Sequence, residues 1–304
     1  MKIIGLFILL AFYCAVGFSQ TPTSTFDGIN YQPIYEVAVS EGSIASGDIV
    51  IPDEVEIGGI KYRVTEISKS AFGNGEGISS IKLGFYVKVL KPYCIYGSFS
   101  KIKLNPHAQV VDPLAFYGCP NLEYIDASDC NYLSDDEGVL YDKYKSKLII
   151  YPSKKASPKY VIPEGVKYIS SYAFWETEVS ELDIPSTVWF VGGFDTAPNL
   201  TTLVVRANTP PTLVINSVDN KVLRECFLYV PDECVEEYKS NKDWGMFKNI
   251  RSINELSNIE TVRTDNIPKA GIYNLNGVRR DNLEPGVNVV VSKEGTAKTI
   301  IHRK

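Results

Sequence analysis

A short motif recurs along the middle of the chain at nearly constant spacing. It stands at 71–72, 115–116 and 173–174 as Ala-Phe, while Cys-Ile at 94–95 and Gly-Phe at 193–194 take the same place in two further copies. The intervals are 23, 21, 58 and 20 residues, so three of them agree and the fourth carries an insertion. A unit of about 20 residues cannot bury its own apolar face, so such units must stack on one another to fold.

Strand-like segments occur in register with this motif. Five apolar-x-apolar pieces follow it, at 81–83, 102–104, 125–127, 182–184 and 203–205. Other pieces lead into it, at 62–67, 86–90, 166–169 and 188–191. Alternation over so few residues predicts strands that bury one face and turn the middle residue outward. The chain is therefore predicted to form a repeat solenoid whose Ile, Leu and Phe side chains share a continuous core.

Three stretches carry a family resemblance, namely 62–72, 115–122 and 162–174. They resemble BspA-type leucine-rich repeats, in which a unit reads approximately as an Ile-Pro strand, a Val-x-x-Ile strand, Ala-Phe, then a Cys and a Leu. The resemblance covers residues 49–250 and implies a right-handed, mostly-β superhelix with short helical or 3-10 turns. The sequence departs from the pattern at 93–100 and 191–198, where irregular coils are expected.

The long interval corresponds to an insertion at 128–160. Segments 139–142 and 148–152 are predicted to be strands around the turn 143–147, and the stretch 133–138 leads into them. The repeat family resembled has a similar hairpin excursion from its solenoid. The acidic cluster Asp135, Asp136 and Glu137 lacks the alternating oxygen ligands and distal Glu of a calcium loop, so a solvated turn is the favoured interpretation over a calcium site.

The solenoid is predicted to have a cap at each end. Residues 224–250 contain a last strand at 227–230, then Pro231 at a first helical position and apolar residues that would cover the final coil. Residues 20–48 alternate in hydrophobicity and are predicted to form an N-terminal β cap. Residues 251–304 are predicted to form a small C-terminal β module, which resembles both structural tails and sorting signals of exported Bacteroidetes-type proteins.

Residues 1–19 read as a secretory signal peptide. Lys2 is followed by an apolar run from 3 to 16 that is too short to span a bilayer comfortably, and small residues precede the predicted cleavage before Gln20. Export permits disulfides, and five cysteines follow this segment, at positions 94, 119, 130, 226 and 234. Buried free thiols are the expected state, and bridges between Cys226 and Cys234 or between Cys119 and Cys130 are the alternatives.

The sequence lacks recognisable catalytic motifs. It has only two histidines, His107 and His302, far apart in sequence, and it contains no nucleophile elbow, zincin helix or phosphate loop. The glycine-rich stretch 73–77 follows the recurring motif and is predicted to be a loop between coils. The net charge of −5, without a basic stripe, argues against nucleic-acid binding. We therefore expect a protein that is not an enzyme and needs neither cofactor nor metal.

Stacked strands should align their outward residues in columns across an extended surface. The candidate binding face formed in this way grades from basic to acidic and comprises Lys82, Lys103, Tyr124, Asp126, Glu181 and Asp183. Tyr132, Tyr141 and Tyr144 are candidate aromatic anchors, because tyrosine is favoured at interfaces. Packing of the insertion onto the solenoid would also explain these tyrosines. Asp195-Thr196-Ala197 resembles an O-glycosylation sequon of exported proteins of these bacteria, with Thr196 as acceptor.

These observations predict an exported, monomeric repeat protein, secreted or associated with the cell surface. The family resemblance implies adhesion to, or recognition of, a host, matrix or neighbouring-cell component, either protein or glycan. A structural scaffold of a surface assembly and an accessory carbohydrate-binding protein are the alternatives. No segment after residue 19 is apolar for long enough to cross a membrane.

Overall fold

The computed structural model describes residues 24–26, 29–31, 35–39, 46–57, 59–73, 77–194, 197–256, 271–274, 279–282, 286–291 and 297–302. The predicted signal peptide, 1–19, lies outside these residues. Contacts divide the chain into two units, Met1–Arg251 and Ser252–Lys304, each of which is described by itself. The sequence predicts the boundary between solenoid and tail after residue 250, and the division of contacts falls after Arg251.

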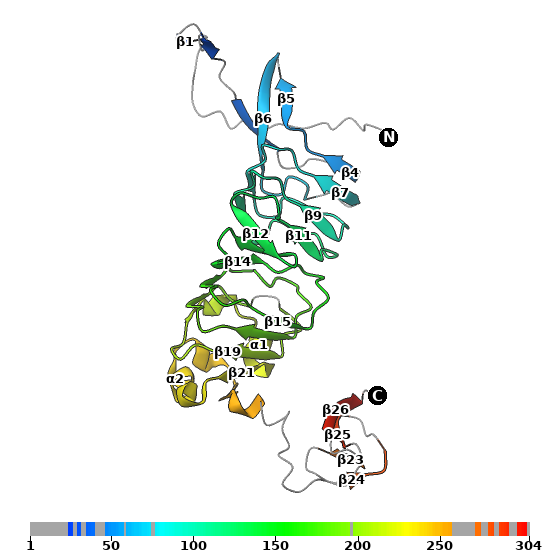
Figure 1. Ribbon diagram of the computed structural model, residues 1–304, viewed down its shortest axis with the longest axis vertical. Helices are drawn as coiled ribbons and strands as arrows, with labels where there is room; N and C mark the ends of the chain where they lie inside the picture. Colours follow the sequence, from blue (N-terminus) through cyan, green and yellow to red (C-terminus); the bar gives the residue numbers. More distant parts are fainter. Residues whose placement is uncertain are drawn as a thin grey trace. The chain divides into compact units, whose positions relative to one another are not determined.

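The first unit is a stack of coils with strands in two columns (Figure 1). The first column runs through β4 (Gly47–Val50), β7 (Ile78–Lys82), β9 (Lys101–Lys103), β11 (Tyr124–Asp126), β15 (Lys159–Val161), β17 (Glu181–Ile184), β19 (Thr202–Val205), β21 (Phe227–Val230) and β22 (Asn249–Ser252). Parallel ladders pair β4 with β7, β9 with β11, and β15 through β21 in succession. The predicted repeat architecture of mostly strands is confirmed.

The second column holds strands that lead into the motif, several of them only two residues long. It contains β3 (Tyr35–Val39), β6 (Ile60–Ile67), β8 (Val89–Leu90) and β10 (Val110–Val111) in one sheet, with β5 (Glu54–Ile57) antiparallel to β6, and then β14 (Lys147–Ile150), β16 (Tyr168–Ile169), β18 (Phe190–Val191) and β20 (Thr212–Leu213) in another. Pairing is parallel between residues one coil apart, as in Ile169 beside Val191. Both columns are interrupted at the insertion, because neither β10 with β14 nor β11 with β15 forms a ladder among the described strands.

The recurring motif lies between the two columns and is buried. Phe72 and Phe174 are 0% and 1% exposed, and Phe116 is 7% exposed. Backbone bonds hold the motif copies one above another, since Phe72 N–H donates to the carbonyl of Cys94 at 3.1 Å and Ile95 N–H to that of Ala115 at 3.1 Å. Burial of each Phe contributes roughly 1.5–3 kcal/mol. The predicted internal stack of motif side chains is confirmed.

The insertion contains one strand more than predicted. β12 (Leu133–Asp136) and β13 (Val139–Asp142) form an antiparallel hairpin, and β13 is antiparallel to β14. The turn uses Glu137 and Gly138, both at positive φ, which is the twist that a two-residue hairpin turn requires. Tyr151 follows β14 and donates its N–H to the carbonyl of Ala173 at 2.8 Å, so it takes the place of a motif aromatic in the stack.

The core divides at the insertion. One cluster of buried side chains runs from Val39 to Ile150, and a second runs from Val139 to Phe247. β13 and β14 contribute side chains to both clusters. On β13, for example, Leu140 lies in the first cluster and Tyr141 in the second. The insertion therefore supplies side chains to both halves of the solenoid.

The C-terminal end of this unit is covered by short helices. α1 (Asn220–Glu225) precedes β21, and η2 (Asp232–Cys234), α2 (Val235–Ser240) and η3 (Trp244–Met246) follow it. Tyr238 and Trp244 are 0% exposed, and their polar atoms donate to the carbonyls of Ala207 and Pro211 at 2.8 and 2.7 Å. Pro231 is the residue just before the 3-10 turn η2, one place ahead of the first helical position predicted for it.

The remaining elements are short sheets and one short 3-10 turn. β1 (Ser24–Phe26) and β2 (Ile29–Tyr31) pair antiparallel near the start, and η1 (Ile215–Ser217) follows β20. The second unit holds the antiparallel strands β23 (Gly271–Asn274), β24 (Arg279–Arg280), β25 (Gly286–Val291) and β26 (Ala297–His302). Among the residues that the structure describes, no helix has the length and apolar character needed to cross a membrane.

Candidate functional site

The predicted binding face lies on the first column of strands, in three separate ladders. Lys103 stands beside Asp126 and Lys101 beside Tyr124, because β9 and β11 pair in parallel. Glu181 and Asp183 lie on β17, in the sheet that begins with β15 after the insertion. Among the described strands no ladder joins β7, which carries Lys82, to β9, or β11 to β15, so the predicted single column is broken at both places.

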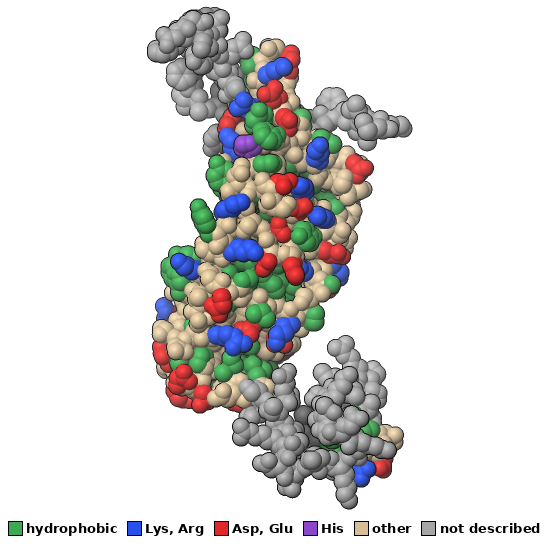
Figure 2. Space-filling model, viewed as in Figure 1, with side chains coloured by type: hydrophobic (Ala, Val, Ile, Leu, Met, Phe, Trp, Pro, Cys, Tyr) green, Lys and Arg blue, Asp and Glu red, His purple; other side chains and the backbone are tan. Residues whose placement is uncertain are grey.

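Ion pairs within this face neutralise most of its charges. Lys101 Nζ lies 3.4 Å from Asp126 Oδ2, and Lys103 Nζ lies 2.6 Å from Asp129 Oδ2. The Lys101 ammonium also stands 4.5 Å from the ring centre of Tyr124. On the face drawn in Figure 2, basic and acidic side chains of the described residues are intermixed. The expected gradient from basic to acidic is thus replaced by local pairs, which weakens the attraction of the face for a charged partner.

Neighbouring side chains form hydrogen bonds or ion pairs with three residues of the predicted face, namely Asp126, Tyr124 and Glu181. The Ser128 hydroxyl donates to Asp126 at 2.7 Å and is the main cause that lowers the pKa of the Asp126 carboxyl, with a smaller contribution from Lys101. Tyr124 Oη donates to Asp135 Oδ1 at 3.2 Å, while burial, followed by the charge of Asp135, raises the pKa of Tyr124. Glu181 forms an ion pair with Lys159 on the adjacent strand.

The exposure predicted for Asp183 is wrong. Asp183 is 5% exposed, and its carboxylate oxygens accept bonds from Arg206 Nε at 2.7 Å and Arg206 Nη2 at 2.6 Å. Arg206 comes from the next coil and covers the carboxylate, so this residue stabilises the stack and offers nothing to a partner. Lys82, by contrast, is exposed on β7 beside Val50 and forms no ion pair with a described residue.

The candidate aromatic anchors separate into two kinds. Tyr132 and Tyr144 are 51% and 89% exposed, as an anchor requires. Tyr141 is 0% exposed and its hydroxyl is hydrogen-bonded to that of Tyr160, so the prediction of a surface anchor is wrong for Tyr141. Burial is the main cause that raises the pKa of both of these hydroxyls. Thr196, the candidate glycosylation site, lies outside the described residues.

A group of aromatic rings that was not predicted lies on the surface beside the motif. We call it the aromatic ladder, and it comprises Tyr93, Tyr96, Tyr117, Tyr172 and Trp175. Tyr117 is central and 38% exposed, with ring centroids 5.2 Å from Tyr93, 6.2 Å from Tyr96 and 5.1 Å from Trp175. Trp175 in turn lies 5.8 Å from Tyr172. The ladder joins coils on both sides of the insertion.

Coil geometry positions two of these rings. Tyr93 and Tyr172 precede the motif, and their φ angles are +58° and +61°. Ser70 holds the equivalent position in an earlier coil, with φ +54°. A non-glycine residue in this region costs roughly 1–2 kcal/mol, which the surrounding coil must offset. The same turn therefore recurs in several coils, and in two of them it carries an aromatic side chain on the surface.

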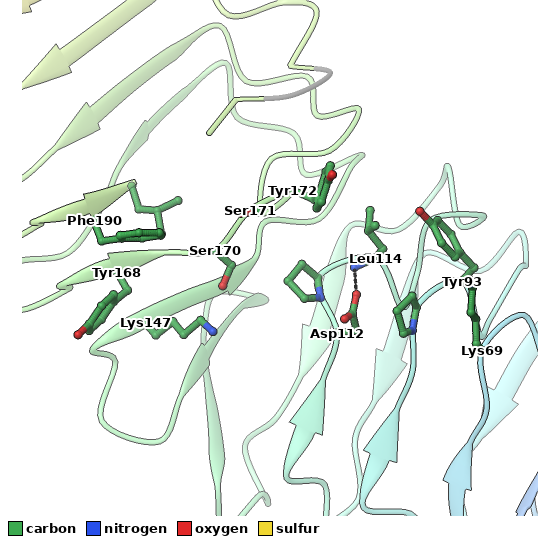
Figure 3. A pocket seen from close by; sticks show the side chains of 13 residues that line it. Lys69, Tyr93, Asp112, Leu114, Lys147, Tyr168, Ser170, Ser171, Tyr172 and Phe190 are labelled. Atoms are coloured by element: carbon green, nitrogen blue, oxygen red, sulfur yellow. Dashed lines mark hydrogen bonds between the residues drawn. The ribbon is translucent and has the colours of Figure 1, made fainter. Parts of the chain in front are cut away.

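A cavity of about 690 Å³ adjoins the ladder, and we call it the insertion cleft. One wall comes from coils before the insertion and the other from coils after it (Figure 3). Its lining consists of Lys69, Pro92, Tyr93, Asp112, Pro113, Leu114, Lys147, Tyr168, Ile169, Ser170, Ser171, Tyr172 and Phe190. The cleft opens where the second column lacks a ladder between β10 and β14.

A second hollow, of about 660 Å³, opens at the corresponding break in the first column. It lies between Tyr124 and Tyr160 and is lined by charges of both signs, including Glu137 and Lys155. Lys155 Nζ donates to the carbonyl of Glu137 at 2.5 Å. In the part of the chain that the structure describes, no group of three or more His, Cys, Asp or Glu side chains could hold a metal ion.

Comparison with known proteins identifies the repeats. Residues 65–196 match the family model of the BspA type leucine-rich repeat region, in six copies. None of the curated proteins matches the sequence.

Solved bacterial leucine-rich repeat structures resemble parts of the chain. One from Eubacterium ventriosum is 22% identical over 55% of this chain and 57% of that protein, with a TM-score of 0.41. A leucine-rich cell surface protein from Faecalibacterium prausnitzii is 15% identical over 77% of this chain and 96% of that one, with a TM-score of 0.39. A third, from Bacteroides ovatus, is 15% identical over 71% and 83%, with a TM-score of 0.25. The chain spans 57% of the Eubacterium protein.

Proposed function

Because residues 65–196 are BspA-type leucine-rich repeats, we propose that this chain is an exported, non-enzymatic protein that recognises a protein outside the cell through its aromatic ladder. The proposal includes adhesion to a host, matrix or neighbouring-cell component. It also includes the predicted organisation, with a signal peptide at 1–19, a β cap at 20–48, a right-handed solenoid at 49–250 with its insertion at 128–160 and cap at 224–250, and a β tail at 251–304.

The observation that carries this proposal is the surface position of the aromatic ladder. Tyrosine and tryptophan are enriched among the residues that contribute most to protein interfaces, because a rigid ring buries a large area while its polar atom stays hydrated. Tyr117 is surrounded by three other rings of the ladder and is itself 38% exposed. Contiguous apolar surface of this kind marks interaction sites on soluble proteins.

The self-neutralised first column favours a second function, that of a structural scaffold. Lys101, Lys103 and Lys159 are each paired with a carboxylate of the same face, so that face has few free charges with which to select a partner. A scaffold would need contacts with its own assembly instead of an external ligand. The two functions differ in whether the isolated chain binds matrix proteins.

Residues 20–304, produced as one chain, can be tested on an array of matrix and cell-surface proteins. We expect binding that falls about tenfold or more in Tyr117→Ser, because loss of a central interface ring costs more than about 1.4 kcal/mol. Tyr144→Ser is the matched control, since Tyr144 is 89% exposed and lies apart from the ladder. If Tyr117→Ser and Tyr144→Ser bind equally well, the ladder does not take part in recognition. If the unaltered chain does not bind, the scaffold function is favoured.

A further inference from the structure

The insertion cleft contains charged groups of opposite sign that do not pair with each other. Lys147 enters from β14, and Asp112 lies on the facing wall, after β10 (Figure 3). Neither side chain forms an ion pair with a described residue. Asp112 Oδ1 accepts the N–H of Leu114 at 2.9 Å, which leaves Oδ2 available.

A buried hydroxyl adds a third polar group. Ser170 lines the cleft and is 6% exposed, and its Oγ has no hydrogen-bond partner in the described structure. A buried hydroxyl without a partner costs roughly 1–3 kcal/mol, so Ser170 Oγ favours a molecule in the cleft that can form a hydrogen bond with it. Its position in the cleft provides a donor or acceptor for a bound molecule.

The remainder of the lining is mainly aromatic and aliphatic. Tyr168 and Phe190 lie on one wall, and Tyr93 and Leu114 lie on the other (Figure 3), while Pro92 and Pro113 also line the cleft. Tyr168 is held in place by Trp189, whose ring centroid lies 4.4 Å away. A cavity of about 690 Å³ with ring faces and a few convergent polar groups has the size and composition of a small-ligand site.

We propose that the insertion cleft binds an uncharged oligosaccharide. Lys147 can only donate hydrogen bonds and Asp112 can only accept them, whereas a sugar hydroxyl does both and can therefore bridge the two walls. The C–H faces of a pyranose ring pack against aromatic faces, which carry partial negative charge. A lipid chain would leave the charges of Lys147 and Asp112 dehydrated and unpaired. A sugar phosphate would be attracted by Lys69 and Lys147, which both line the cleft, and repelled by Asp112, so it is the competing class that the test must separate.

This site goes beyond the proposed function. Tyr93 and Tyr172 belong to both the ladder and the cleft, but Lys147 and Asp112 lie outside the ladder and Tyr117 lies outside the cleft lining, so these three residues test the two sites separately. Residues 20–304 would be titrated calorimetrically with a panel of uncharged di- to tetrasaccharides, and with short peptides and sugar phosphates as competing classes. We expect one or more of the uncharged sugars to bind. Lys147→Gln and Asp112→Asn should each weaken that binding by about tenfold or more, the usual effect of losing a hydrogen bond to a charged group.

Lys61→Gln is the matched control, because Lys61 is an exposed lysine on β6, outside the cleft lining. Asn at 112 can keep the bond to the Leu114 N–H, and Lys147→Gln removes an ammonium group that has no structural partner, so folding is expected to survive both changes. Tyr117→Ser should retain sugar binding. The inference is overturned if none of the uncharged sugars binds, if both cleft variants bind normally, or if only peptides or sugar phosphates bind.

Discussion

Arg206 donates from both Nε and Nη2 to the two carboxylate oxygens of Asp183, one coil away. The side chain of Asp183 is 7% exposed and that of Arg206 is 50% exposed, so the guanidinium closes the carboxylate off from water. The bond with Asp183 is also the main cause that raises the pKa of Arg206. The pair links Asp183 on β17 to Arg206, the residue directly after β19, at the point where the sequence predicted an open face.

Replacement of Arg206 by Gln should destabilise the solenoid by about 3 kcal/mol, because it leaves a buried carboxylate without its partner. Urea unfolding followed by circular dichroism would measure the loss. Lys103→Gln is the control, since both members of the Lys103–Asp129 pair are 57% exposed and such pairs contribute about 0–1 kcal/mol. Equal effects of the two changes would contradict the structural role assigned to Arg206.

Gly192→Ala should separate two coils. A Cβ at Gly192 would lie 2.2 Å from the backbone nitrogen of Ser171 and 2.6 Å from the carbonyl carbon of Ser170, so the backbone itself would have to move. We expect a loss of about 1–3 kcal/mol in the free energy of unfolding. Gly73→Ala is milder in the same measurement, because its Cβ would come no closer than 3.2 Å, to the carbonyl oxygen of Ser70. The reverse order of stability would show that this close approach is not a constraint.

The solenoid should lose stability at alkaline pH. Burial raises the pKa of Tyr151 to about 12, and burial likewise raises the pKa of Tyr141 and Tyr160. Tyrosine in the unfolded chain ionises near pH ~10, so the folded state binds more protons above that value and its stability falls as pH rises towards 12. Urea midpoints between pH ~9 and ~12 test this. Tyr151→Phe should reduce the slope, and a midpoint independent of pH would refute the prediction.

The cysteines should resist modification in the folded protein. Cys94, Cys119, Cys130, Cys226 and Cys234 are all buried thiols. Burial raises the pKa of Cys119 and Cys226 to about 12 and that of Cys130 to about 11, and the thiolate is the reactive form. Iodoacetamide at pH ~8 should therefore label them only after unfolding. Intact mass without reductant distinguishes this state from the Cys119–Cys130 and Cys226–Cys234 bridges, either of which would contradict it.

The repeat made the stacking of coils predictable, because the strand positions follow directly from the period. Ile102 is buried and its neighbours Lys101 and Lys103 are exposed, as alternation requires. The extra strand β12 was missed, since an acidic stretch has low strand propensity and it pairs only through the tight turn at Glu137 and Gly138. The hand of the solenoid stays a prediction.

The candidate site was less predictable, because its residues meet only once the register between coils is known. Asp183 was expected to be exposed, and its neighbour Arg206 lies two positions beyond the residue paired with it, Val204. The ladder has a signal in the sequence. Its rings stand directly before or after the recurring motif, as Tyr117 follows Phe116 and Trp175 follows Phe174. A comparison of the motif's flanking positions would have found it.

The insertion has a consequence for how arrays of this kind can change length. An ordinary coil touches only the coil above and the coil below, so duplication or loss of one coil leaves the hydrogen-bond register of the others intact. The hairpin of β12 and β13 instead supplies side chains to two cores, through Leu140 and Tyr141. Gain or loss of whole coils during evolution is therefore least disruptive to the core in the segments before and after the hairpin. The hairpin itself has to stay in place between two segments that can change in length.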